Sequence, residues 1–371
     1  MSNILDYIGW RGDLSFGNAP LCPPDALVFS TLAYVDLSDI VPRDPREEPV
    51  RLSTAAERFF AAGRDAGAHS ALLSAMAAST RFGSLRLFGA ARQTDREDGV
   101  QFGAVSVLLP GGALFAAFEG TDNSLVGWKE DFRMSYECPV PAQRMAVRYF
   151  EAVAAAYPLR RLYLGGHSKG GNLAMYAAVH AGPAATERIR TVYNNDGPGF
   201  CDGTVYSPAY AAVRSRIRTY LPASSFVAVL LEHDQAYDVV ESTGRGISQH
   251  DAYAWQVRGR AFVPAERRTA FGERTEAILG EFLTNMSPTR RREFCEALFT
   301  VLEGSEQETL SGIGQKKWES ARSFMRTYSA MSPEMRQVIS DAVKALRRTA
   351  KNVDKRQEKK KAAGSEPERD A

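Results

Sequence analysis

The sequence predicts an α/β domain with a mostly parallel sheet, followed by a helical C-terminal region. Between residues 85 and 231, strand patterns alternate with helical patterns, and such alternation is typical of a parallel sheet covered on both faces. After residue 265 the strand patterns stop and helical patterns continue. The chain is 44% hydrophobic and 10% aromatic, so it has enough apolar surface for a folded core.

Each expected element follows from the spacing of its apolar residues. Short apolar runs predict strands over residues 85–88, 104–109, 113–118, 161–164, 188–194, 216–221 and 226–231. Apolar residues three and four positions apart predict helices over residues 53–79, 142–157, 169–181, 269–284, 288–303, 315–330 and 333–349. The longest uncharged run, residues 99–118, could span a membrane by its length. Pro110, Gly111 and Gly112 divide it, so we expect a hairpin instead.

We expect four regions along the chain. Residues 1–50, rich in Pro, Gly and Asp, predict an irregular N-terminal arm with one short helix near residues 25–35. Residues 51–265 form the α/β domain, and residues 266–350 form the helical region. Residues 351–371 are polar and lack aromatic residues, which is typical of a disordered charged tail.

Charge and cysteine content argue against several classes of protein. The 46 basic and 44 acidic residues give a net charge of +2, so we expect no nucleic-acid partner. The four cysteines form no Cys-x-x-Cys pair, which argues against a disulfide framework or a structural zinc site. The first residues lack the basic and apolar parts of a signal peptide, so we expect a cytoplasmic protein.

The most informative segment surrounds Ser168. Residues 162–174 have the sequence LYLGGHSKGGNLA, which contains Gly-x-Ser-x-Gly at positions 166–170. An apolar strand precedes this motif and a helix of small residues follows it, as a nucleophile elbow requires. A glycine-rich turn that binds phosphate is the alternative, although Lys169 follows the serine where a Walker motif has its lysine first. We predict that Ser168 is a nucleophile.

This segment resembles the elbow of the α/β-hydrolase superfamily, and within it that of the lipase-like serine hydrolases. Residues 114–121 (LFAAFEGT) and 128–132 (WKEDF) are similar to the strand, Gly-Thr turn and Trp-x-x-Asp segment of fungal-type lipases. Core packing and a carboxylate at a helix start also explain Trp128 and Asp131. The resemblance covers residues 85–260. It implies that the backbone N–H groups of Thr121 and Lys169 form an oxyanion hole.

The opening segment, residues 3–16, resembles a bacterial branch of the same lipase-like proteins. That resemblance implies no substrate. The side chain of Lys169 departs from the apolar residue that lipases have after the serine, and we expect it to be solvated or paired with a nearby acid. The alternative is a cation placed near an anionic group of the substrate, such as a phosphate or carboxylate.

The chain has five histidines that could supply the catalytic base. In α/β-hydrolases the base follows the nucleophile and the acid, which excludes His69 and His167, and His180 lies on the helix behind the elbow. His250 precedes an aromatic segment similar to one late in the lipase domain, so we favour it over His233. A solvated surface histidine is the alternative role of His250.

Asp196 is the predicted acid of the site. It ends the strand over residues 188–194, at the sheet edge where catalytic groups gather, and its position resembles that of the acid in pancreatic-type lipases. Residues 222–226, the more usual position, contain no carboxylate. Glu232, Asp234 and Asp238 remain rivals, and an Asx turn is the structural alternative for Asp196.

The sequence therefore predicts a serine hydrolase that cleaves a carboxylic ester or thioester, with Ser168, His250 and Asp196 as its triad and with no cofactor or metal. The expected partner is a small-molecule or lipid-like ester. The alternative is an inactive hydrolase-like scaffold that binds a protein partner through its C-terminal helices. Transient membrane-surface contact through Arg356 and residues 359–361 stays open, although solvated charged tails are commoner. The sequence does not specify the acyl chain or the oligomeric state.

Overall fold

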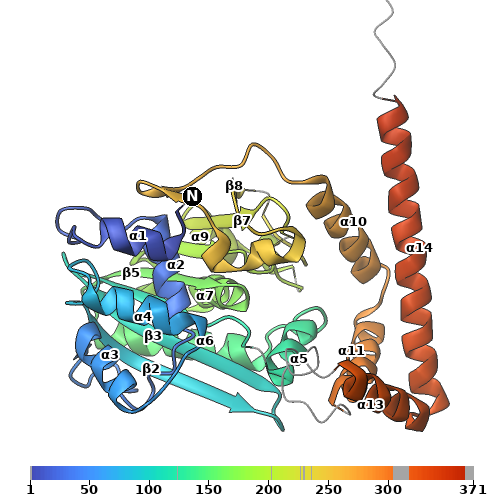
Figure 1. Ribbon diagram of the computed structural model, residues 1–371, viewed down its shortest axis with the longest axis horizontal. Helices are drawn as coiled ribbons and strands as arrows, with labels where there is room; N and C mark the ends of the chain where they lie inside the picture. Colours follow the sequence, from blue (N-terminus) through green and yellow to red (C-terminus); the bar gives the residue numbers. More distant parts are fainter. Residues whose placement is uncertain are drawn as a thin grey trace, which may run out of the picture. The chain divides into compact units, whose positions relative to one another are not determined.

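The computed structural model describes residues 2–122, 124–201, 203–225, 227–228, 230–234, 236–303 and 317–363 (Figure 1). Its contacts divide the chain into two compact units, Met1–Arg268 and Thr269–Ala371. The first contains the sheet and the second contains the C-terminal helices. Within the described ranges, no helix is long and apolar enough to cross a membrane.

An eight-stranded sheet, with its strands in sequence order, is the centre of the first unit. The strands are β1 (Val50–Arg51), β2 (Arg86–Asp95), β3 (Val100–Leu109), β4 (Ala113–Phe118), β5 (Arg161–His167), β6 (Ile189–Asn195), β7 (Ile217–Pro222) and β8 (Asp238–Val240). Strands β1 to β4 pair antiparallel, and β4 to β8 pair parallel. This mixed, mostly parallel sheet confirms the predicted α/β fold class.

Two expectations about strands have clear outcomes. Residues 99–118 form the β3–β4 hairpin, with Gly111 and Gly112 at positive φ in its turn, as the Pro-Gly-Gly sequence predicts. The strand expected over residues 226–231 is absent from the described residues of that segment, and β8 forms later. Residues 226 and 229 lie outside the described residues.

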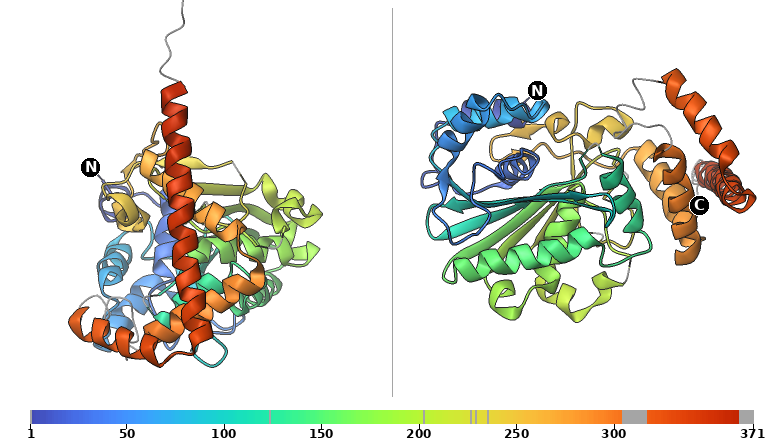
Figure 2. Two further views of the ribbon diagram at one scale, coloured as in Figure 1. Left: turned by 90° about the vertical axis from the view of Figure 1, so that its right-hand side faces the viewer. Right: turned by 90° about the horizontal axis from the view of Figure 1, so that it is seen from below.

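Helices cover both faces of the sheet (Figure 2). One face carries α6 (Pro141–Ala156), α7 (Lys169–His180) and α9 (Pro208–Arg214), which connect successive parallel strands. Right-handed crossovers between neighbouring strands return on the same side, so these helices share a face. The other face carries α1 (Ile4–Arg11), α2 (Pro23–Leu32), α3 (Leu52–Ala61) and α4 (Ala68–Ala78). Helices α5 (Leu125–Arg133) and α8 (Pro183–Thr186) also belong to this unit.

Strand β4 shows how one apolar run serves two cores. All of its residues are buried. Leu114, Ala116 and Phe118 join the core under α6 and α7, whereas Phe115 and Ala117 join the core under α2. Successive side chains of a strand point to opposite faces, so a strand covered on both sides needs a continuous apolar sequence.

The N-terminal segment is part of the fold. The helix expected near residues 25–35 is present as α2, but the expectation of an otherwise irregular arm is wrong. The segment contains α1 and α2, and α2 packs on β4, β5 and β6. Nearly all residues of α2 are buried, so the helix lacks the amphipathic period by which surface helices are recognised. The expected helix over residues 53–79 is also two helices, separated by Gly63 and Gly67 at positive φ.

A buried ion pair fixes this segment to the rest of the unit. The guanidinium of Arg81 donates from Nε to Asp25 Oδ1 at 2.7 Å and from Nη2 to Oδ2 at 2.5 Å. Both side chains are fully buried. Arg81 also donates to the backbone carbonyls of Leu14 and Ala19, each at 3.0 Å. One arginine therefore connects α2 to the loop between α1 and α2.

The second unit contains α10 (Ala270–Thr284), α11 (Pro288–Glu303), α13 (Lys317–Ala330) and α14 (Pro333–Ala363), and it confirms the predicted helical region. Helices α10 and α11 pack against α14. The disordered tail expected from residue 351 is wrong as far as Ala363, since α14 continues to that residue. Residues 351–363 are rich in Ala, Lys, Arg, Glu and Gln, which favour a helix without needing a core. Residues 364–371 lie outside the described residues.

We expect Arg81→Met to lower the free energy of unfolding by about 3–5 kcal/mol, because it leaves the Asp25 carboxylate buried without its partner. Urea denaturation followed by intrinsic fluorescence measures the change. Arg46→Met removes an exposed ion pair with Asp44 and is the matched control, with no expected change. The double variant Arg81→Met/Asp25→Asn should recover part of the loss, because it removes the unpaired charge and keeps an oxygen that can accept from the Tyr7 hydroxyl. A single variant as stable as the wild type contradicts this role.

Candidate active site

Ser168 occupies the tight turn between β5 and α7. Its backbone has φ 57° and ψ −133°, a conformation that side chains rarely adopt. A Cβ atom on Gly166 would lie 2.1 Å from the carbonyl of Gly170, and one on Gly170 would lie 2.2 Å from the carbonyl oxygen of Phe118. Both positions therefore require glycine, and the turn has the geometry expected of a nucleophile elbow.

The structure brings Asp196 and His250 together beside this turn. Asp196 follows β6, the neighbour of β5, and the backbone N–H of Ser168 donates to the carbonyl of Asn195 at 3.0 Å. His250 Nδ1 lies 2.6 Å from Asp196 Oδ2. The His250 ring packs 4.6 Å, centroid to centroid, from the ring of His167, the residue before the serine. A carboxylate at Nδ1 holds the proton on that nitrogen and leaves the Nε2 lone pair free to accept one.

Asp196 is itself held firmly. Its carboxylate is fully buried, and Oδ1 accepts from the hydroxyl of Ser225 and from the backbone N–H of Ala228 at 3.3 Å. Its backbone has φ 57°, which side chains other than glycine rarely adopt. Oδ2 therefore bonds His250, and Oδ1 bonds the loop after β7.

The rival residues lie in other contacts. Asp234 pairs with Arg214, Glu232 accepts from the backbone N–H of Gly203 at 2.8 Å, and Asp238 begins β8. His233 Nδ1 lies 3.1 Å from the carbonyl of Leu231. Among the described residues, the carboxylate bonded to the His250 ring is that of Asp196.

His167 has a contact that the sequence does not reveal. Its Nε2 lies 2.8 Å from the carbonyl oxygen of His250, and its Nδ1 lies 3.2 Å from the hydroxyl of Tyr34. Since a carbonyl only accepts, Nε2 carries the proton and Nδ1 accepts from the tyrosine. Burial, and then the nearby His250, lower the pKa of His167 to about 3, so the ring stays neutral near pH 7. The elbow thereby holds the loop that carries His250.

The end of β4 lies directly on the elbow. A Cβ atom on Gly120 would lie 2.5 Å from the carbonyl oxygen of His167. Thr121 follows, and its hydroxyl donates to Asp131 Oδ2. The backbone of Thr121 and the first residue of α7, Lys169, therefore belong to segments in direct contact. This is the arrangement that the predicted pair of oxyanion donors requires.

The side chain of Lys169 is buried and paired, so of the two expectations for it the solvated one is wrong. Its Nζ donates to the backbone carbonyl of Gln101 at 2.9 Å, to Gln101 Oε1 and to Glu130 Oε2 at 3.1 Å. One feature of the sequence points to the Lys169–Glu130 pair. A lysine in the first turn of a buried helix needs a buried acid nearby, although spacing alone does not identify which acid.

Two further carboxyl groups near Lys169 have raised pKa values. Burial raises the pKa of Asp131 to about 6, against the opposing effect of Lys169. Burial raises the pKa of Glu119 to about 7, although Arg92 donates to Glu119 Oε1 at 2.8 Å. Of the two groups, Glu119 is therefore about half ionised near pH 7, whereas Asp131 is mostly ionised.

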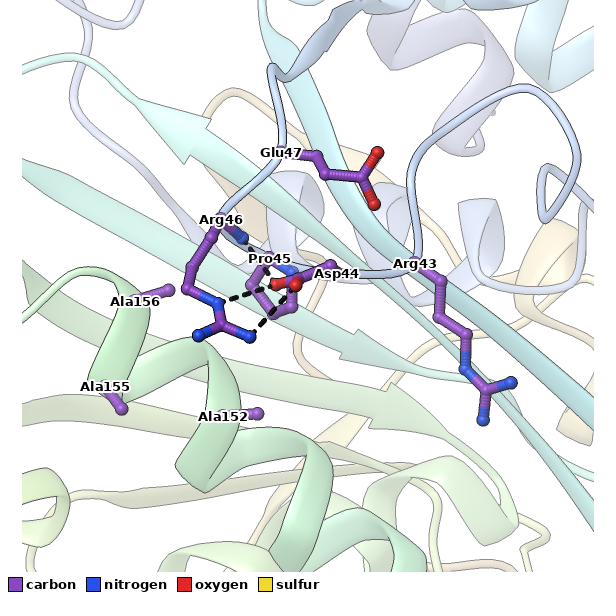
Figure 3. A pocket seen from close by; sticks show the side chains of 8 residues that line it. All are labelled: Arg43, Asp44, Pro45, Arg46, Glu47, Ala152, Ala155 and Ala156. Atoms are coloured by element: carbon purple, nitrogen blue, oxygen red, sulfur yellow. Dashed lines mark hydrogen bonds and ion pairs between the residues drawn. The ribbon is translucent and has the colours of Figure 1, made fainter.

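A cavity of about 750 Å³ lies elsewhere in this unit (Figure 3). It is lined by Arg43, Asp44, Pro45, Arg46, Glu47, Ala152, Ala155 and Ala156. The last three belong to the C-terminal end of α6, which leads into the amino end of β5. Ser168 follows the carboxyl end of β5, so this cavity is not part of the serine site. Among the described residues, no group of three or more His, Cys, Asp or Glu side chains could hold a metal ion.

The chain is similar to several solved lipases. The M37 lipase superposes with a TM-score of 0.38 at 14% identity, over 55% of this chain and 68% of the lipase. A Rhizomucor miehei lipase in complex with its propeptide gives 0.36 at 14% identity, over 65% of this chain and 81% of that chain. A deletion mutant of the same complex gives 0.36 at 15% identity, over 58% and 66%. No curated protein sequence matches the chain. The model of the Mbeg1-like family matches residues 76–300, more than half of the sequence, and the chain therefore belongs to the Mbeg1-like family.

Proposed function

We propose that this protein is a serine hydrolase that cleaves a carboxylic ester or thioester through an acyl-enzyme. The observation that carries the proposal is the 2.6 Å contact between His250 Nδ1 and Asp196 Oδ2, beside a serine in a strained strand-to-helix turn. Backbone strain of this kind costs about 1–3 kcal/mol per residue and is typical of sites where a side chain must be presented.

In the first half of the reaction, Ser168 Oγ attacks the carbonyl carbon of the substrate. His250 Nε2 accepts the hydroxyl proton, and Asp196 stabilises the imidazolium that results. Negative charge develops on the carbonyl oxygen, and the backbone N–H groups of Thr121 and Lys169 donate to it. The N-terminus of α7, which begins at Lys169, adds a favourable dipole.

In the second half, the tetrahedral intermediate collapses. His250 returns its proton to the leaving alkoxide or thiolate, and the acyl group stays on Ser168. Water then attacks the carbonyl carbon of the acyl-enzyme while His250 accepts one of its protons. The bond from that carbon to Ser168 Oγ breaks, His250 returns the proton to Ser168 Oγ, and the carboxylic acid leaves. These steps use only groups of the chain and water.

An inactive scaffold that binds a protein partner is the second candidate function. It is favoured by exposed apolar side chains on the second unit, among them Phe271 and Met325 with 49% and 67% of their surface exposed. A scaffold has no need, however, of positive φ at both Ser168 and Asp196. The hydrolase therefore explains features of the first unit that the scaffold leaves without a cause.

We expect a fluorophosphonate probe to label the wild-type protein and to leave Ser168→Ala unlabelled, because the probe reacts with an activated serine. His250→Ala should lower kcat/KM for a p-nitrophenyl ester by at least about a thousandfold, since it removes the base. Gel fluorescence and a chain-length series of esters provide the readouts. His233→Ala is the matched control and should label and turn over like the wild type. Labelling that persists in Ser168→Ala contradicts the proposed nucleophile.

The acid is tested by a pair of isosteric changes. Asp196→Asn should lower kcat by about 10⁴-fold, because an amide at Nδ1 favours the wrong tautomer of the imidazole. Asp234→Asn alters a rival carboxylate and should leave kcat unchanged. Steady-state kinetics on both variants decides the assignment, with circular dichroism to show that each is folded. The reverse pattern would move the acid to Asp234.

A further inference from the structure

The proposed mechanism uses the backbone of Lys169 and gives its side chain no task. That side chain nevertheless buries a full charge beside the nucleophile, with 1% of its surface exposed. A buried ion pair usually adds little net stability over a well-packed apolar pair, so packing alone does not require a lysine here. Its hydrogen-bond partners are Gln101 and Glu130, and Gln101 in turn bonds Gly120, the residue before the predicted oxyanion donor Thr121.

Every donor of the ammonium is used. Lys169 Nζ donates to both oxygens of Gln101, backbone and side chain, and to Glu130 Oε2. Glu130 Oε2 also accepts from the backbone N–H of Gln101 at 3.0 Å, and Oε1 accepts from the N–H of Ala142 at 2.9 Å. Gln101 and Glu130 are buried to 99% or more. The ammonium is therefore held in one position by groups from β3 and α5.

The ammonium determines which way the Gln101 amide faces. An ammonium only donates, so the atom next to Nζ is the amide oxygen Oε1. The amide nitrogen Nε2 then faces the opposite way and donates to the carbonyl oxygen of Gly120 at 3.2 Å. Without the charge of Lys169, the same amide could turn over and present its oxygen to that carbonyl.

Gly120 and Thr121 share one peptide group. In a planar trans peptide, the C=O of one residue and the N–H of the next point in opposite directions. A hydrogen bond that holds the Gly120 carbonyl toward Gln101 therefore turns the Thr121 N–H away from Gln101. That N–H is one of the two donors of the proposed oxyanion hole.

We propose that Lys169 and Gln101 are positioning residues that aim the N–H of Thr121 at the oxyanion. Lys169 thus serves the oxyanion hole twice, once through its own backbone N–H and once through its side chain and Gln101. The inference rests on the proposed hydrolase function. It concerns the transition state, where the oxyanion exists, and leaves the binding of the uncharged substrate unaffected.

Gln101→Glu tests this step because it keeps the oxygen that accepts from Lys169 and removes the N–H group that donates to the Gly120 carbonyl. A glutamate still accepts from Lys169, so a merely structural role predicts normal activity. The glutamate carboxylate has no donor for the Gly120 carbonyl. We therefore expect kcat for a p-nitrophenyl ester to fall about ten- to a hundredfold with KM unchanged. Complete loss of one oxyanion donor lowers kcat by about 10²–10³-fold, and here the donor is only misdirected. The affinity for an alkylboronic acid, which forms a tetrahedral anionic adduct on the serine, should fall by the same factor.

Gln143→Glu is the matched control. Gln143 is buried to 99%, accepts from the N–H of Val140 at 2.9 Å and donates to Asn172 Oδ1 at 2.9 Å, away from the Gly120–Thr121 peptide. It should keep the wild-type kcat and boronate affinity. If Gln101→Glu does not fold, Lys169→Met/Glu130→Gln removes both charges together and frees the Gln101 amide, with the same expected loss.

The outcomes separate this inference from the proposed function. Folded variants with unchanged kcat and boronate affinity would overturn the inference while Ser168-dependent turnover stands. A raised KM at constant kcat would overturn it as well, because the residues would then act on substrate binding. Absence of Ser168-dependent turnover in the wild type would overturn the proposed function and this inference with it.

Discussion

Direct contact between backbones is the constraint on which the candidate site depends. The end of β4, the end of β5 and the first turn of α7 approach so closely that Gly120, Gly166 and Gly170 leave no room for a side chain. A Cβ atom on Gly171 would likewise lie 2.2 Å from the Asn194 amide oxygen on β6. Three strands and one helix start thus converge on Ser168, and the groups proposed to act on a substrate come from separate segments held at fixed positions.

The two sides of this convergence are stabilised differently. Toward α5 the contacts are charged, with Lys169, Glu130 and Gln101 buried together. Toward the N-terminal helices they are neutral, with Tyr34 bonded to His167 and His167 bonded to the backbone that carries His250. A neutral imidazole on one side and a compensated ammonium on the other keep the elbow free of unpaired charge. Such a setting is suited to a reaction in which charge appears only transiently.

Local sequence predicted the parts of this arrangement that are local in structure. The elbow, the β3–β4 hairpin and the position of Asp196 after β6 depend on glycines, turn residues and strand ends, which leave a mark in a short window of sequence. The ring direction of His167, the acid partner of Lys169 and the amide direction of Gln101 depend on residues 39 to 133 positions away. Periodicity carries no information at that range. Helix α2 was missed as part of the core for a related reason, since a helix buried on all sides has no polar face.

The backbone N–H of Val257 donates to the carbonyl oxygen of Ser2 at 2.7 Å, so the beginning and the end of the first unit meet. During synthesis, the N-terminal helices leave the ribosome long before their partners at His167 and Val257 exist. Contacts of such large sequence separation make assembly slow, because the entropy of closing a long loop is lost before the contact forms. The unit can therefore close only after nearly all of its chain has emerged. Until then the part of the α2 surface that packs on β5 and β6 stays exposed, and exposed apolar surface of this kind favours aggregation of an incompletely folded chain.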